Sequence, residues 1–113
     1  MIDDLKARLR NFIVLNSGER IHPREIEEIL YQFPGVKEAA VVGKTDPRKG
    51  ELPIAFVVAN DGVVLDEKTL QQFVRHKLAD YKVPRKVVLL PALPRNATGK
   101  ILKTTLRELP VLG

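Results

Sequence analysis

Apolar residues along the chain fall into three short, nearly continuous runs that predict buried β-strands. The runs cover residues 36–43, 52–59 and 86–90, and each is rich in β-branched or other aliphatic residues and bounded by turn-forming residues. The polar segment 44–51 between the first two runs is typical of a turn that joins antiparallel neighbours. We therefore expect a small sheet of about three strands.

Other segments repeat their apolar residues every three or four positions, which predicts about three helices. The first helix begins at Pro23, which fits a first helical turn, and ends before Pro34. The second begins after the capping residue Asp66, and the third covers about 100–109. The predicted inward-facing residues are Ile26, Ile29, Leu30 and Phe33 in the first helix, Leu70, Phe73, Val74, Leu78 and Tyr81 in the second, and Ile101, Leu102, Leu106 and Leu109 in the third.

The N-terminal part of the chain predicts a β-hairpin with a basic entry, formed by Lys6, Arg8 and Arg10. Residues 11–15 are typical of a strand, and 16–19 of a turn in which Gly18 can adopt positive φ before the chain returns through 20–21. The expected order is β-β-α-β-β-α-β-α, with helices over one small sheet, so the fold class is α+β. No repeat or linker interrupts this order, and residues 1–113 are expected to form a single domain.

Composition narrows the class of protein. Of the 113 residues 44% are apolar and 29% charged, as in a globular domain. The chain has no cysteine, which excludes disulfides and thiolate metal sites, and its two histidines, His22 and His76, are poor material for a metal cluster, so no metal site is expected. The sequence has no apolar run near the ~20 residues of a membrane helix and no signal-peptide pattern. We expect a cytoplasmic protein with no membrane partner.

The net charge of +5 is the global feature that points to a class of ligand. A basic surface attracts anions, whether nucleic acid, a membrane surface or phosphorylated small molecules. Cations that could form such a surface include Lys44, Arg48, Lys49 and Lys82. A merely solvated surface explains the same charge, because net charge reports on solubility and association rather than on fold.

Residues 94–100, with the sequence Pro-Arg-Asn-Ala-Thr-Gly-Lys, form the segment best suited to present a catalytic or ligand-binding side chain. The Lys100 ammonium can deliver positive charge to a phosphate or carboxylate, and Gly99 before it leaves room for close approach. The segment is not a Walker A loop, because the first glycine of that motif would fall at Pro94 and Ile101 replaces its Ser or Thr. Taken alone, these residues also fit an ordinary solvated turn before a helix.

Several segments together carry a family resemblance. They are residues 18–27, residues 36–43 with Asp46 beyond, and residues 99–103, with residues 79–84 and 93–95 as further landmarks. In this order and spacing they resemble the C-terminal domain of the adenylate-forming (AMP-binding) enzyme superfamily, which includes acyl-CoA synthetases, peptide-synthetase adenylation domains and firefly luciferase. The resemblance covers nearly the whole chain, from about residue 8 to residue 106.

The resemblance implies an ATP-dependent ligase that converts a carboxylic acid to an acyl-adenylate and then to a thioester of CoA or of a carrier-protein pantetheine. It implies a large N-terminal adenylation domain, in cis or in trans, that binds ATP with its Mg; this chain alone would hold no cofactor and be inactive. An acyl carrier protein is a further candidate partner. The loop meeting the nucleotide and acyl-adenylate would comprise Arg95, Thr98, Gly99 and the catalytic Lys100, whose position at a helix start would also favour anions.

The resemblance also implies a domain movement after adenylation. The hinge position corresponds to Arg10, where relatives carry Asp or Lys, and Ala7 replaces a nearby glycine of the family pattern. The loop of Ser17, Gly18 and Glu19 matches the loop that lines the thiol-acceptor tunnel. A plain β-turn at residues 17–19 and solvated cations at the hinge are the alternatives. For His22 and His76 the sequence favours structural or surface positions.

Two other functions fit the sequence. The chain could be a stand-alone accessory domain that acts in trans, or a basic module that binds anions or nucleic acid. The sequence lacks an interleaved basic and aromatic motif, so no nucleic-acid partner is expected. Lys100 also resembles a lysine that is acetylated in some relatives, where loss of its charge would oppose adenylation.

Overall fold

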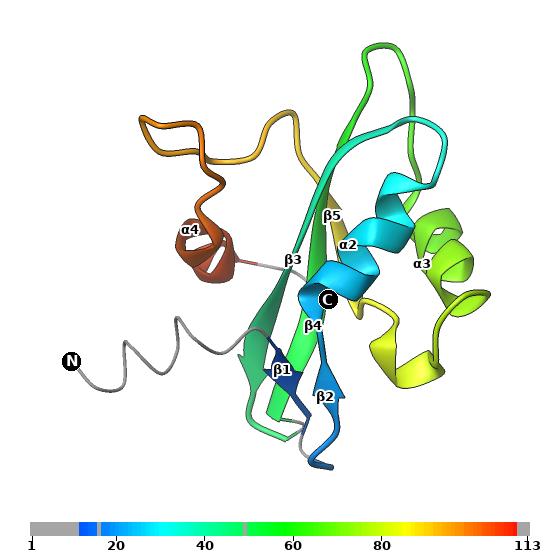
Figure 1. Ribbon diagram of the computed structural model, residues 1–113, viewed down its shortest axis with the longest axis vertical. Helices are drawn as coiled ribbons and strands as arrows, with labels where there is room; N and C mark the ends of the chain where they lie inside the picture. Colours follow the sequence, from blue (N-terminus) through cyan, green and yellow to red (C-terminus); the bar gives the residue numbers. More distant parts are fainter. Residues whose placement is uncertain (1–11, 16, 49, 111–113) are drawn as a thin grey trace.

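The computed structural model describes residues 12–15, 17–48 and 50–110, and its elements follow the predicted order. The elements are β1 (Ile13–Val14), β2 (Arg20–Ile21), α2 (Pro23–Tyr31), β3 (Val36–Asp46), β4 (Gly50–Ala59), α3 (Glu67–Arg75), the 3₁₀ turn η1 (Asp80–Lys82), β5 (Lys86–Leu89) and α4 (Lys103–Glu108). Strands β1 and β2 form a small antiparallel hairpin (Figure 1). The predicted α+β class, with its hairpin, three-stranded sheet and three helices, is confirmed.

The main sheet has the order β3-β4-β5, with β3 antiparallel to β4 and β4 parallel to β5. Strands β3 and β4 are longer than predicted, because Lys44, Thr45 and Asp46 pair with Leu52, Glu51 and Gly50. The predicted turn over 44–51 was therefore too long. Backbone pairing between β3 and β4 continues past their apolar runs. The polar side chains of this extension lie half-buried or exposed where the chain turns from β3 into β4.

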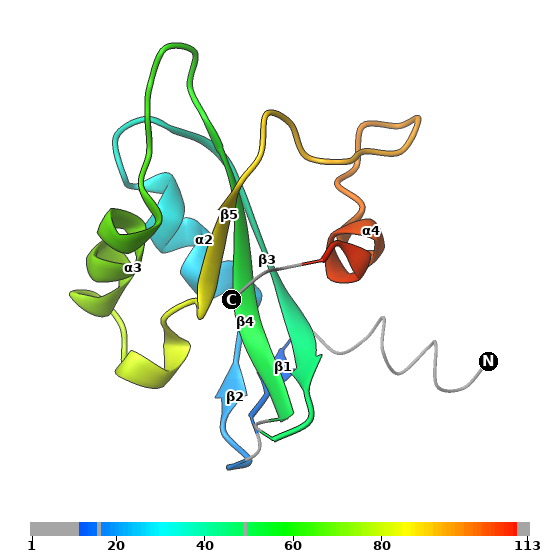
Figure 2. The same ribbon diagram turned by 180° about the vertical axis from the view of Figure 1, so that it is seen from behind.

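Both faces of the sheet are covered, and each has its own apolar core. Helices α2 and α3 lie on one face and α4 with the segment before it lies on the other (Figures 1 and 2). In β4, Ala55 and Val57 belong to the first core, whereas Ile54, Phe56 and Val58 belong to the second. A strand buried on both faces reads as a continuous apolar run rather than an alternating one. This explains the run at 52–59.

The helical faces agree with the predicted periodicity, although α3 ends earlier than predicted. In α2, Ile26 and Leu30 are fully buried, and Asp66 caps α3 by accepting a 3.0 Å hydrogen bond from the Thr69 amide. Helix α3 ends at Arg75, so Tyr81 belongs to η1 and is 40% exposed instead of facing the core from the helix. The described residues include no helix long and apolar enough to cross a membrane.

Two glutamates satisfy backbone N–H groups on the outer edges of the sheet. Glu27 of α2 accepts from the Val41 amide of β3 at 2.8 Å, and Glu67 of α3 accepts from the Val87 amide of β5 at 2.7 Å. A covered edge cannot pair with another strand. Each of the two helices therefore satisfies one N–H group of an edge strand as well as covering the same face of the sheet.

Candidate functional site

Lys100 lies in a tightly hydrogen-bonded loop that projects between β5 and α4 (Figure 1). Arg95 and Ile101 form an antiparallel bridge at its base. Across the loop the Asn96 amide donates to the Lys100 carbonyl at 2.9 Å, and the Leu102 amide donates to the Pro94 carbonyl at 2.8 Å. The backbone on both sides of Lys100 is therefore held by hydrogen bonds.

The Asn96 side chain organises the inside of this loop. Its Oδ1 accepts hydrogen bonds from the Thr98 amide at 3.0 Å, the Thr98 hydroxyl at 2.7 Å and the Lys100 amide at 2.9 Å. Between those two residues Gly99 adopts φ of +88°, a conformation that residues with a side chain rarely take. A short polar side chain and one glycine thus shape the turn that carries Lys100.

Arg95 connects the loop to the sheet. Its guanidinium donates to the Gly99 carbonyl at 2.6 Å and forms an ion pair with the carboxylate of Glu38 in β3. The Glu38 side chain is 20% exposed, and the Arg95 side chain is 40% exposed. A fork-shaped guanidinium can bind a carbonyl and a carboxylate at the same time, which an ammonium group does less well.

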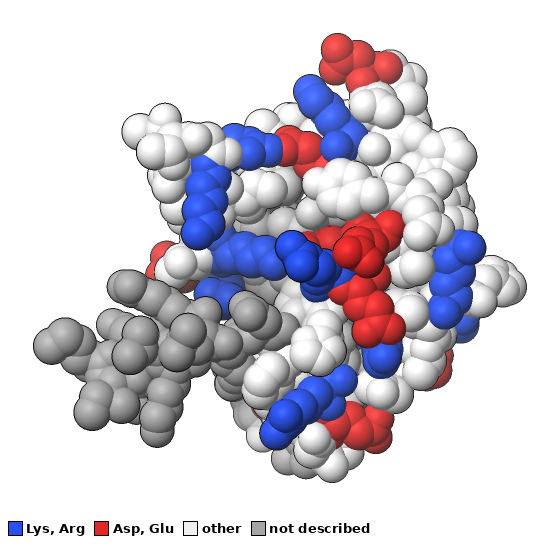
Figure 3. Space-filling model, in the orientation of Figure 1, with Lys and Arg blue, Asp and Glu red and all other residues white. Residues whose placement is uncertain are grey.

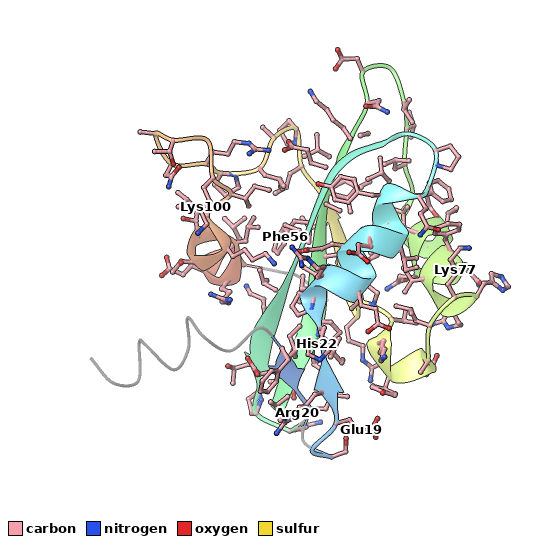
Figure 4. All side chains as sticks on the ribbon, viewed as in Figure 1. Glu19, Arg20, His22, Phe56, Lys77 and Lys100 are labelled. Carbon is pink, nitrogen blue, oxygen red and sulfur yellow. The ribbon has the colours of Figure 1, made fainter. Side chains whose placement is uncertain are left out.

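The Lys100 side chain is exposed and projects from the loop beside α4 (Figure 4). Among the described residues its ammonium has neither an ion-pair partner nor a hydrogen-bond partner. Helix α4 begins at Lys103, not at Lys100 as predicted, because the bridge at the loop base keeps the preceding backbone non-helical. The prediction that the helix dipole favours anions at Lys100 is therefore wrong, because the effect is confined to the first turn of a helix and Lys100 lies before α4.

The predicted thiol-side loop lies far from Lys100. Ser17, Gly18 and Glu19 are exposed at the hairpin tip, where Gly18 has φ of +90° and its amide donates to the Leu15 carbonyl at 2.8 Å. The hairpin and the Lys100 loop lie toward opposite ends of the longest axis in both views (Figures 1 and 2) and in the side-chain view (Figure 4). The structure does not bring these two predicted sites together.

The hinge residues and histidines named in the sequence analysis lie outside the described residues or at the ends of helices. Arg10, the hinge residue, lies outside the described residues, as do Arg8 and Ala7. His22 is exposed at the start of α2, with its ring edge-on to Phe12 at 6.1 Å between centroids, and His76 is exposed at the end of α3. Within the described ranges no three His, Cys, Asp or Glu side chains are grouped as metal ligands.

The basic surface includes Lys44, as predicted, together with cations that the sequence analysis did not name. A hollow of about 580 Å³ on the sheet is lined by Lys44, Arg85, Lys86 and Arg107, with Asp46 beside them. Of the cations expected, Lys82 instead pairs with Glu25 at 3.0 Å, and Lys49 lies outside the described residues. On the face seen in Figure 3, basic and acidic side chains lie side by side rather than in one basic field.

Two residues that pair with cations on either side of Lys100 in the sequence were missed by sequence reasoning, namely Glu38 and Glu27. Glu38 pairs with Arg95 as described above, and the carboxylate of Glu27 pairs with the Lys103 ammonium at 2.8 Å. Both glutamates fall within the segments that carry the family resemblance. Their charge in otherwise apolar or helical segments was the available signal, but the sequence did not identify their partners.

Comparison with known proteins gives consistent similarities. The sequence profile of the AMP-binding enzyme C-terminal domain matches residues 25–100. The chain is 45% identical over 104 residues to the long-chain-fatty-acid–CoA ligase FadD13 of Mycobacterium tuberculosis, covering 92% of this chain and 20% of that protein. It is 48% identical over 100 residues to a 2-succinylbenzoate–CoA ligase of Bacillus cereus, covering 88% of this chain and 20% of that protein.

Solved structures show the same relation. A fatty acyl CoA synthetase of Mycobacterium tuberculosis superposes with a TM-score of 0.80 at 45% identity, over 88% of this chain and 20% of that one. Apo MatB from Rhodopseudomonas palustris superposes with a TM-score of 0.83 at 37% identity, over 89% of this chain and 20% of that one. The chain spans about a fifth of the length of these relatives.

Proposed function

Because this chain belongs to the family of AMP-binding enzyme C-terminal domains, we propose that it supplies an adenylation lysine, Lys100, to an ATP-dependent carboxylate-activating ligase. The observation that carries the proposal is the geometry of Lys100. Its ammonium is exposed and without a partner in the described residues, yet its backbone is held by hydrogen bonds on both sides. A charge presented in this way is available to a ligand.

The proposed chemistry explains why a positioned cation is needed. A carboxylate oxygen of the acid attacks the α-phosphorus of ATP, and the bond from that phosphorus to the β-phosphate oxygen breaks, giving the acyl-adenylate and pyrophosphate. Two anions must approach each other in this step. The Lys100 ammonium offsets the charge where it accumulates, and a preorganised group does so without reorganising during the reaction.

The proposal requires a second domain. Within the described part of the chain, neither the hollow at Lys44 nor a smaller one at Gln71 is lined by Lys100 or another residue of its loop. Lys100 therefore has to enter a pocket formed elsewhere. The relatives named above are about five times as long as the stretch they share with this chain, which supports a large adenylation domain as the partner, in cis or in trans. That domain would bind ATP and its Mg²⁺.

We further propose that the same chain serves thioester formation by turning its other end toward the active site. The hairpin tip, with Ser17, Gly18 and Glu19, lies toward the opposite end of the longest axis from the Lys100 loop. A rotation about a hinge at Arg10 would thus exchange one loop for the other. The names of FadD13 and of 2-succinylbenzoate–CoA ligase favour CoA over a carrier-protein pantetheine as the thiol.

Carboxylate-dependent ATP–pyrophosphate exchange tests this function in the ligase that this chain forms with its large domain. Lys100→Ala should lower the exchange rate by roughly 100- to 1,000-fold, the usual cost of removing one charge-stabilising donor. Lys100→Arg, which keeps the charge but changes its shape, should retain more activity. Exchange within twofold of wild type for Lys100→Ala would refute the proposal.

The basic hollow favours one second candidate, a surface for anions. Lys44, Arg85, Lys86 and Arg107 surround it, although the Lys86 ammonium is already 3.4 Å from a Glu67 carboxylate oxygen. If nucleic acid were the ligand, binding would weaken steeply with salt, by about one unit of log-log slope per phosphate contact. If binding showed no such salt dependence, nucleic acid would be excluded as the ligand and the ligase function would be the remaining proposal.

A further inference from the structure

Two ion pairs hold the two ends of the segment that carries Lys100. At the start Arg95 pairs with Glu38, and at the end the Lys103 ammonium lies 2.8 Å from the Glu27 carboxylate. Lys100 lies between them and is the cation of this segment that has no partner among the described residues. Both anchoring carboxylates come from outside the segment, one from β3 and one from α2.

Both carboxylates are largely shielded from solvent, at 20% exposed for the Glu38 side chain and 18% for that of Glu27. Glu38 lies in β3 directly after an irregularity in the pairing with β4, between Val36 and Glu38, and such bulges re-aim side chains. Glu27 also accepts the Val41 amide at 2.8 Å, and its side chain is 18% exposed. Neither anchor is a long, freely rotating surface side chain. An ion pair with a carboxylate whose position is restricted also restricts the position of the cation that binds it.

We propose that Glu38 and Glu27 are positioning residues for adenylation, acting on Lys100 through Arg95 and Lys103. The inference rests on the proposed function of Lys100. Arg95 pairs with Glu38 of the sheet and also donates a 2.6 Å hydrogen bond to the Gly99 carbonyl, one residue before Lys100. These two contacts tie the backbone next to Lys100 to the sheet. Asn96 completes the frame from inside the loop, since its Oδ1 accepts the Lys100 amide.

The energetic reason is the exposure of the loop. Residues 95–100 are all exposed, so packing contributes little to their order, and hydrogen bonds and ion pairs must supply it. Isolated exposed ion pairs contribute little to stability. Their value here lies in geometry, because a displacement of about 1 Å at a reacting group can cost up to 100-fold in rate. Loss of an anchor should therefore affect the reaction more than the fold.

The main test is Glu38→Gln, which keeps the shape of the side chain and removes its charge. We expect about a tenfold fall in kcat for ATP–pyrophosphate exchange with the KM for ATP nearly unchanged. Thioester formation from supplied acyl-adenylate should stay within twofold of wild type, because Lys100 is withdrawn in that step. Glu27→Gln, whose amide oxygen can still accept the Val41 N–H, should show the same selectivity with a smaller fall.

Arg95→Lys is a second variant that preserves charge. An ammonium group does not reproduce the forked contact to both the Gly99 carbonyl and Glu38, so exchange should fall as in Glu38→Gln. If Glu38→Gln fails to fold by circular dichroism, Arg95→Lys tests the same link. Asp66→Ala is the matched control, because it destabilises α3 by removing its cap, and α3 lies on the other face of the sheet from the Lys100 loop (Figures 1 and 2).

The outcomes separate the inference from the function on which it rests. A collapse of exchange in Lys100→Ala, together with a selective loss in Glu38→Gln and Arg95→Lys, supports both. A collapse in Lys100→Ala with Glu38→Gln and Arg95→Lys within twofold of wild type overturns the inference alone. Equal losses in both half-reactions, as for a general loss of stability in Asp66→Ala, also overturn it. Unchanged exchange in Lys100→Ala refutes the proposed function and the inference with it.

Discussion

Replacing Leu106 by alanine should destabilise the protein more than its place in a six-residue helix suggests. Leu106 is fully buried and is the buried residue of α4, which has no side-chain cap at its N-terminus. So short a helix is not stable by itself in water, so packing must hold it in place. Leu106 packs in the second core with Phe56, Ala40 and Val42 (Figure 4 shows Phe56 between the sheet and α4).

The magnitude follows from this burial. Leu106→Ala removes three carbons from the core at about 0.8 kcal/mol each, so the transfer loss is about 2.4 kcal/mol. A cavity that the neighbours close only in part raises the total to about 3–4 kcal/mol. Urea unfolding of the chain, followed by circular dichroism, measures the change in the free energy of unfolding. The slope of that free energy against urea should be unchanged if the whole fold is affected.

Leu109→Ala is the matched control, since Leu109 is only half-buried at the end of the same helix. It should cost about 1 kcal/mol, because much of its surface already contacts water. A loss below about 1 kcal/mol for Leu106→Ala would refute the reasoning, as it would mean that α4 does not depend on this contact. So would a loss equal to that of Leu109→Ala.

Two further substitutions test local features of the fold. Asp66→Ala should lower the free energy of unfolding by about 1 kcal/mol in the same urea assay, since it removes the acceptor of the Thr69 amide and hydroxyl, while Asp66→Asn should recover most of the loss. Gly99→Ala should lower the free energy of unfolding by about 1–2 kcal/mol from its φ of +88° alone, because a Cβ there meets no atom within 4 Å. The rate of pyrophosphate exchange should also fall, because the strain displaces Lys100. A change in the free energy of unfolding below about 0.5 kcal/mol with a normal exchange rate would contradict this prediction.

Much of the architecture follows from local patterns in the sequence. The β-branched runs predict strands because such side chains pack well on a pleated surface. The helical faces of Ile26 with Leu30 and of Leu70 with Val74 follow from periodicity, and all four residues are buried. The capping role of Asp66 also follows, since a short acceptor side chain satisfies a free N–H of the next turn. The combination of residues 18–27, 36–43 and 99–103 identified the family, which the profile match at residues 25–100 confirms.

Only the tertiary structure decided the contacts between distant segments. The start of α4 at Lys103 depends on the bridge from Arg95 to Ile101, a local closure that apolar periodicity does not record. Periodicity reports which residues leave water, but an ion pair depends on where two chain segments meet in space. The link from Glu38 to Arg95 joins positions 57 residues apart, 95 minus 38, and the sequence showed only two charged residues. The frame around Lys100 could therefore be seen only once the sheet, the loop and α2 had been placed together.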